Sequence, residues 1–138
     1  MSVPFDFKKE YKEYYLPACK PAIVDVPTMN YIAVRGGHGD PNEEGGAYAR
    51  ALNILYSIAF TIKMSPCVGK STDGYYEYVV PPLESFWWQN NVCGVDYSNR
   101  STFNWISVIR LPDFVNKADF DWAVSQATRK KKLDCSAA

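Results

Sequence analysis

Apolar residues recur at helical spacing in two well-separated stretches of the chain. The first predicts a short helix over Phe5 to Tyr15, which the prolines at positions 17 and 21 bring to an end. The second predicts a long helix from about Ala47 to Lys63, closed by Pro66. Its apolar stripe follows the i, i+3, i+4, i+7 pattern of an amphipathic helix and consists of Tyr48, Ala51, Leu52, Leu55, Ala59 and Ile62.

A third amphipathic helix is predicted over Lys117 to about Lys131, with Asn116 as its N-cap. Its inward positions are Phe120, Ala123, Val124 and Ala127. The run Arg129-Lys130-Lys131-Lys132 closes this helix, where positive charge favours the negative end of the helix dipole. We therefore interpret the run as a solvated helix end and not as a nucleic-acid site.

Alternation of apolar and polar residues predicts the strands. Ala22 to Val26 and Tyr31 to Arg35 are expected to pair as one hairpin around a turn at residues 28–30. Tyr75 to Val80 and Leu83 to Trp88 are separated by a proline pair, and Thr102 to Leu111 alternates strongly. The order helix, hairpin, long helix, hairpin, helix predicts an α+β fold, an antiparallel sheet of two hairpins with helices packed on one side.

Size and charge narrow the function classes. The 138 residues match one ordinary domain, so residues 1–138 are expected to form a single unit, and 47% hydrophobic residues suffice for a core. The formal net charge is zero, which excludes bulk attraction to nucleic acid or to an anionic membrane surface. Since no apolar run reaches the length of a membrane span, we expect a cytoplasmic protein without membrane association.

Metal and phosphate chemistry find little support in the sequence. The four cysteines at positions 19, 67, 93 and 135 are widely spaced without a C-x-x-C pair, which argues against a zinc site. Residues 36–42 form a glycine-rich loop that matches neither the G-x-G-x-x-G pattern nor the Walker pattern of phosphate-binding loops. We therefore favour a connector between a strand and a helix. His38, the single histidine, sits in this loop without an evident partner. We expect neither a metal nor a cofactor.

The stretch from Tyr75 to Trp88 is the most suggestive of function, because it combines two glutamates, Glu77 and Glu84, with six aromatic residues in fourteen positions. Aromatic faces beside a partly desolvated carboxylate are suited to a flat, apolar or cationic molecule. A hairpin with aromatic residues in the core and glutamates in water is the alternative. Strand alternation places Tyr76 and Tyr78 on one face and Glu77 on the other.

Six blocks of this sequence together resemble the amino-terminal half of GyrI-like small-molecule-binding proteins. In chain order they are F-D-F-K-K-E-Y-K-E-Y-Y, K-P-A-I-V-D-V-P-T-M-N-Y-I-A-V-R-G, G-D-P-N-E-E-G-G, S-I-A-F-T-I-K-M-S, P-P-L-E-S-F-W-W and L-P-D-F-V-N. They span nearly the whole chain. The resemblance is specific because all six fall in register.

The resemblance implies a fold of two similar halves related by a pseudo-two-fold, with a ligand cleft between them. Relatives serve as effector-binding domains of multidrug-responsive activators, and a freestanding branch looks like hydrolases that open the cyclopropane ring of DNA-alkylating xenobiotics. Glu84, Trp87 and Trp88 match the family block P-L-E-G-L-W-W, and Trp105 matches the tryptophan of the next strand. Ser85 and Phe86 depart from the usual Gly and Leu of that block.

The family pattern continues beyond the length of this chain. One half alone would leave a sheet face and half of a cleft open to solvent. We therefore expect a homodimer in which a second copy completes the cleft. The alternative is a truncated fragment that is marginally stable or that binds a separate protein partner.

Three functions remain open from the sequence. The favoured one is binding of hydrophobic, including cationic, small molecules by the residues Glu84, Trp87, Trp88, Trp105, Tyr76 and Tyr78. The second is hydrolysis of a cyclopropane-bearing xenobiotic, for which Glu84 is the candidate catalytic group. The third is a non-catalytic interaction subunit. The sequence favours binding over catalysis, because no more complete catalytic set is present.

Overall fold

The computed structural model describes residues 2–132, 134–136 and 138, and its centre is a three-stranded antiparallel sheet. β5 (Asn104–Leu111) is the middle strand, flanked by β2 (Asn30–His38) and β4 (Leu83–Trp88). Along β4, Glu84 lies opposite Val108 and Trp87 lies opposite Trp105. The sheet thus fixes which side chains of the three strands share a face.

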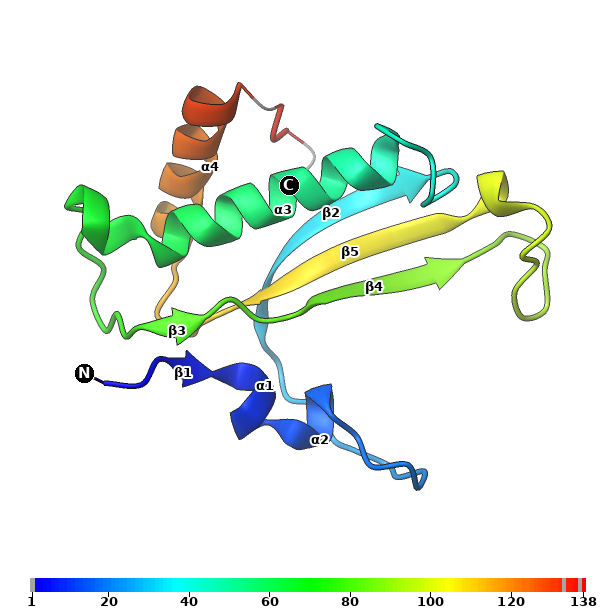
Figure 1. Cartoon of the computed structure of the whole chain (residues 1–138), viewed down its shortest axis with the longest axis horizontal. Coiled ribbons are helices and arrows are strands. Elements are labelled where there is room, and N and C mark those ends of the chain that lie inside the picture. Colours follow the sequence, from blue (N-terminus) through cyan, green and yellow to red (C-terminus); the bar gives the residue numbers. More distant parts are fainter. Residues whose placement is uncertain (1, 133, 137) are drawn as a thin grey trace.

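Two helices cover one face of this sheet (Figure 1). α3 (Ala47–Lys63) packs its apolar stripe on β2 and β5, and α4 (Lys117–Lys131) packs on α3. The predicted cap of α4 is confirmed, because the Asn116 side chain accepts from the Asp119 N–H while the Asp119 side chain accepts from the Asn116 N–H. The core between helices and sheet includes Ile32, Val34, Leu55, Ile58, Trp105, Ile109 and Ala123.

The N-terminal segment lies on the side of the sheet opposite α3 (Figure 1). It comprises β1 (Phe5–Asp6), α1 (Phe7–Glu10) and α2 (Lys12–Tyr15), so the single helix predicted here is broken at Tyr11. β1 pairs in parallel with β3 (Tyr78–Val79). Two short 3-10 turns, Ser65–Val68 and Arg100–Thr102, complete the elements.

The first predicted hairpin is wrong. Residues 22–26 form no strand, and Ile23 is fully exposed. Pro21 and Pro27 bound this stretch and cannot donate to a ladder, and β2 pairs with β5 instead. The segment 16–29 is therefore an extended arm that projects from the molecule (Figure 1).

The strand predicted over Tyr75 to Val80 shrinks to the two residues of β3. β3 pairs with β1 and not with β4, since the prolines at 81 and 82 interrupt the chain between them. The predicted strand over Leu83 to Trp88 is confirmed as β4, but its antiparallel partner is β5, whose predicted bounds were Thr102 to Leu111.

The α+β class, with an antiparallel sheet and its two long helices on one side, is confirmed. Within the described residues, no helix is both long and apolar enough to cross a membrane.

Candidate functional site

Strand alternation sorts the side chains of β4 onto two faces. Leu83, Ser85 and Trp87 lie opposite Ile109, Ser107 and Trp105, which face the helices. The intervening residues Glu84, Phe86 and Trp88 therefore point to the other side of the sheet. We call that side the open face, made up of Tyr31, Ala33, Glu84, Phe86, Trp88, Ile106, Val108 and Arg110.

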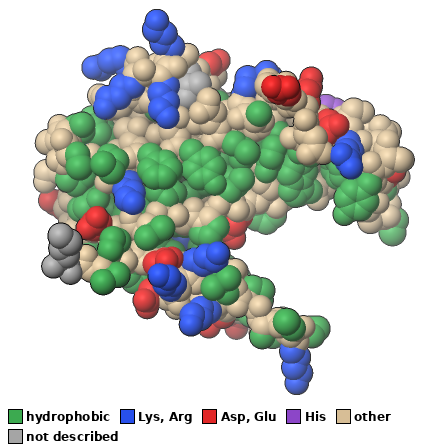
Figure 2. Space-filling view, viewed as in Figure 1, with side chains coloured by type: hydrophobic (Ala, Val, Ile, Leu, Met, Phe, Trp, Pro, Cys, Tyr) green, Lys and Arg blue, Asp and Glu red, His purple; other side chains and the backbone are tan. Residues whose placement is uncertain are grey.

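The open face is only partly covered. The N-terminal segment packs over one end of it, and Figure 2 shows a hollow between that segment and the far end of the sheet. Phe86 is 63% exposed and Trp88 is 44% exposed, whereas Val108 is buried. Two large apolar rings of the open face are thus left exposed to solvent.

Glu84 supplies the acid of this face. Its Oε2 is buried and has no hydrogen-bond partner among the described residues. Burial raises the pKa of Glu84, and the nearby Arg110 offsets part of that rise. A carboxylate in this state is poised to accept a hydrogen bond or a proton from a partner that is not part of the sheet.

Arg110 supplies the positive charge of the open face. It is 6% exposed, and its guanidinium carbon lies 4.6 Å from the ring centre of Phe7 and 4.8 Å from that of Tyr11. Both rings come from the N-terminal segment, so cation–π contacts hold this segment against the sheet. The Nε and Nη1 groups have no acceptor among the described residues, and a buried donor without a partner is costly.

Phenol groups surround this pair. Tyr31 lies opposite Arg110 in the register of β2 and β5, and its hydroxyl donates to the Met29 sulfur at 3.3 Å. Burial, followed by the negative charge of Glu84, raises the pKa of Tyr31. Tyr76 is 38% exposed; burial raises its pKa, and the positive charge of Arg110 opposes that rise. The phenols therefore stay protonated near neutral pH and can donate.

Tyr76 and Tyr78 belong to an aromatic cluster at the N-terminal end of the open face. Tyr76 lies edge-on to Phe5 at 5.6 Å and to Phe114 at 5.1 Å between ring centres. Tyr78 is 1% exposed, and burial raises its pKa strongly. Tyr76 is the partly exposed member of this cluster, whereas Tyr78 is a buried packing residue.

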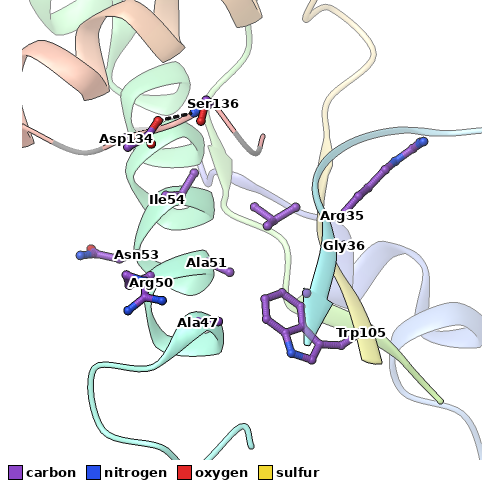
Figure 3. A pocket seen from close by; sticks show the side chains of 12 residues that line it. Arg35, Gly36, Ala47, Arg50, Ala51, Asn53, Ile54, Trp105, Asp134 and Ser136 are labelled. Atoms are coloured by element: carbon purple, nitrogen blue, oxygen red, sulfur yellow. Dashed lines mark hydrogen bonds between the residues drawn. The ribbon is translucent and has the colours of Figure 1, made fainter. Parts of the chain in front are cut away.

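Trp87 and Trp105 lie on the helix-covered face, away from Glu84 and Trp88. Trp105 is 1% exposed and packs edge-on against Tyr48 of α3, with ring centres 5.2 Å apart. Figure 3 shows it beside Ala47 and Ala51, at a cavity of about 380 Å³ between α3 and β2. Trp87 and Trp105, which the sequence analysis grouped with Glu84, therefore lie on the opposite face of the sheet from Glu84.

Gly37 explains how the buried indole is accommodated. β2 carries an irregularity between Val34 and Gly37, where its register against β5 shifts. A Cβ at Gly37 would lie 2.2 Å from atoms of the Trp105 ring, so the backbone of β2 runs directly over the indole. Only glycine permits this close approach.

Arg110 and Tyr31 were not identified from the sequence. Alternation from Trp105 along β5 would have placed Arg110 on the opposite face, and an arginine between Ile109 and Leu111 is unusual in an apolar strand. Its partners Phe7 and Tyr11 lie about a hundred positions earlier in the chain. No sequence pattern of the strand alone identifies them.

Other candidate chemistry is sparse. His38 Nδ1 lies 3.0 Å from Asn104 Oδ1, a pairing at the end of the β2–β5 ladder. The described part of the chain contains no group of three or more His, Cys, Asp or Glu residues arranged to hold a metal ion. Of the cysteines, three are exposed and Cys135 is buried.

The fold and the open face define a small α+β domain whose two long helices cover one side of the sheet, while the short N-terminal segment covers only part of the other side. Two crystal structures of hydrolases from Listeria innocua are similar to it, with TM-scores of 0.82 and 0.87 and 43% sequence identity each. They cover 96% and 98% of this chain, which in turn covers 62% and 64% of theirs. A third structure, of an uncharacterized conserved protein from Listeria innocua, has a TM-score of 0.83 and 44% identity, covering 96% of this chain and 63% of its own.

The chain therefore spans slightly less than two thirds of the length of each of these proteins. No family model and no curated protein matches it.

Proposed function

We propose that the open face binds hydrophobic small molecules, cationic ones included, and that the chain corresponds to the amino-terminal half of a GyrI-like binding domain. One observation carries the proposal. Arg110 is buried and Glu84 is half-buried on this face, and each has buried polar atoms without a partner among the described residues. Buried charged groups are normally paired, so an external group is the expected partner.

The apolar part of such a ligand has suitable surroundings. Phe86 and Trp88 present exposed rings on the same face as Glu84, and Tyr31 and Tyr76 stand at its borders. Flat rings stack well on aromatic side chains, and a positive charge over an aromatic face is attracted by its quadrupole. The polar end of the ligand would then reach Glu84.

Arg110 affects which ligand charge the open face prefers. Its charge opposes the negative potential of Glu84, so the face does not attract cations by net charge alone. A ligand that carries both a donor and an acceptor would satisfy the two groups at once. Neutral polar heads on a flat apolar body are thus accommodated along with cations.

A binding titration with the planar cationic dye proflavine tests the proposal. We expect Trp88→Ala and Glu84→Gln each to weaken binding by about tenfold, the loss of one aromatic contact or one charge-assisted hydrogen bond. Trp87→Ala is the matched control, because the two tryptophans are neighbours on β4 but point to opposite faces. Dye binding that responds to Trp87→Ala and ignores Trp88→Ala would contradict the assignment to the open face.

Hydrolysis of the bound molecule is the second candidate function. Two structures similar to this chain bear the name hydrolase, and the half-buried Glu84 has the raised pKa expected of a group that moves protons. In this proposal Glu84 takes a proton from water as the water oxygen bonds to a cyclopropane carbon. The ring bond at that carbon breaks, its electron pair moves into the electron-poor conjugated system, and a phenol such as Tyr31 returns a proton there.

Mass spectrometry of a cyclopropane-bearing alkylating agent tests this step. The product expected after incubation is the substrate plus one water. We expect Glu84→Gln to abolish formation of this product while Trp87→Ala retains it. Binding of the agent without any added water would reject the hydrolase and leave the binding proposal standing.

We also propose that a second copy of the chain completes the cleft. Phe86, Trp88 and Tyr31 expose apolar surface on one face, as expected of a surface that another body covers. Sedimentation velocity should then give a dimer, and Phe86→Glu should shift it towards monomer. A monomer that binds proflavine with unchanged affinity would reject the dimer but not the site.

A further inference from the structure

A second pocket lies at the end of the sheet, where the β2–α3 loop meets the long β4–β5 loop. Its volume is about 480 Å³, within the roughly 300–1,000 Å³ of typical small-molecule sites. Trp87 lines it, and therefore this end pocket lies across β4 from Glu84 and Trp88. The other apolar lining residues are Pro41, Val95, Tyr97 and Phe103.

The lining of the end pocket is largely aromatic. Phe103 is buried, with its ring centre 5.8 Å from Trp87 in an edge-to-face arrangement and 6.5 Å from Tyr97. Tyr97 is 71% exposed and Val95 is 50% exposed. Large apolar side chains held in solvent beside a pocket mark a surface for a flat apolar ligand.

Arg100 is the only charged residue among those that line the end pocket. Within the described residues its guanidinium takes part in no ion pair and no hydrogen bond. Asp96, the acid in the same loop, is already engaged, because its Oδ1 accepts from the Ser98 N–H at 3.0 Å and from the Ser98 hydroxyl at 2.5 Å. Arg100 is thus the only lining residue of the end pocket that can pair with a charged ligand.

The β4–β5 loop is fixed by one buried amide. Gln89 Nε2 donates to the carbonyls of Asp96 and Asn99 and to the Thr102 hydroxyl, at 2.9–3.2 Å. Gln89 Oε1 accepts from the Asp96 N–H at 2.8 Å. Because the loop is tied on both sides of Tyr97, its aromatic and charged groups are held in place before a ligand arrives.

We propose that the end pocket binds a flat aromatic molecule that carries one anionic group, of the class of aromatic carboxylates. The ring packs against Trp87 and Tyr97, and the carboxylate accepts hydrogen bonds from Arg100 in the two-point geometry that guanidinium favours. This site is independent of the proposed function of the open face. The two sites prefer ligands of different charge.

Isothermal titration with 2-naphthoate tests the proposal, with 2-naphthylmethylammonium as the ligand of reversed charge. We expect naphthoate to bind and Arg100→Gln to weaken it by about tenfold or more, the effect of one charge-assisted contact. Arg129→Gln, which removes an exposed arginine from the end of α4, is the matched control and should leave binding unchanged. Equal binding of the ammonium ligand would overturn the charge preference.

Two variants of β4 locate the binding site. Trp87→Ala should abolish naphthoate binding, and Trp88→Ala should preserve it, with circular dichroism used to establish that both variants are folded. Loss of binding in Trp88→Ala alone would assign naphthoate to the open face and overturn the proposal. The absence of naphthoate binding to the unmodified protein would overturn it as well.

Discussion

The two faces of the sheet differ in the charge of the polar groups that they leave without a partner. On the helix-covered face, the hydroxyl groups of Ser85 and Ser107 form a hydrogen bond at 2.8 Å, so the buried Ser107 hydroxyl has a partner. On the open face, Glu84 and Arg110 retain buried atoms without a partner in the described chain. Trp105 Nε1 on the covered face also lacks a partner in the described chain, but it is a neutral group, whereas the open face leaves atoms of two charged groups unsatisfied.

Removing the indole of Trp105 should give the largest effect. Trp105→Ala empties a fully buried position and is expected to reduce the free energy of unfolding by about 3–5 kcal/mol. Trp88→Ala, on the open face, should cost about 1 kcal/mol or less because the ring is 44% exposed. Urea denaturation measures both. Similar losses for the two variants would mean that the faces do not differ in their role.

The sequence was sufficient for the elements whose signals are local. The stripe of α3 and the cap of α4 lie within single segments, so periodicity and Asn116 defined both helices with nearly correct ends. β4 and β5 carried enough alternation to be located, although their pairing with each other was not predicted. The hairpin at residues 22–26 failed because apolar content alone does not supply a partner strand.

Sequence patterns identified only some of the residues of the candidate site. The family-like block drew attention to Glu84, Trp87 and Trp88 together, although alternation along one strand separates Trp87 from the other two. The Arg110 guanidinium packs against the rings of Phe7 and Tyr11, which lie close to Arg110 only in the folded chain. Such long-range contacts leave no signal in spacing or composition.

A smaller effect is expected from the serine pair on the covered face. Ser107→Ala leaves the Ser85 hydroxyl without its partner and should reduce the free energy of unfolding by about 1 kcal/mol. Ser85→Ala should behave similarly. The double variant should cost less than the sum of the two, since the second substitution removes a group that is already unpaired. Strict additivity in this cycle would show that the hydroxyls do not interact.

The smallest effect concerns the pH dependence of stability, and it isolates the open face. The folded-state pKa of Glu84 is raised by burial above its ordinary value of 4.5, so the folded protein holds the proton more tightly than the unfolded chain. This contribution to stability is fully present below pH 4.5 and is lost as the pH rises through the raised pKa. Glu84→Gln lacks it and should therefore become more stable relative to the unmodified protein as the pH increases across this window.

Denaturation midpoints of both proteins between pH 4 and pH 8 measure the difference. Glu77→Gln is the matched control, because Glu77 is an exposed glutamate in the same part of the chain. A curve for Glu84→Gln that runs parallel to that of the unmodified protein would mean that water already solvates the carboxylate. A ligand that satisfies the ionised Glu84 should weaken the pH dependence, because it lowers the cost of holding the charge in the folded state. Proflavine added to the unmodified protein should therefore bring its curve closer to that of Glu84→Gln, and this convergence would link the unpaired carboxylate to binding.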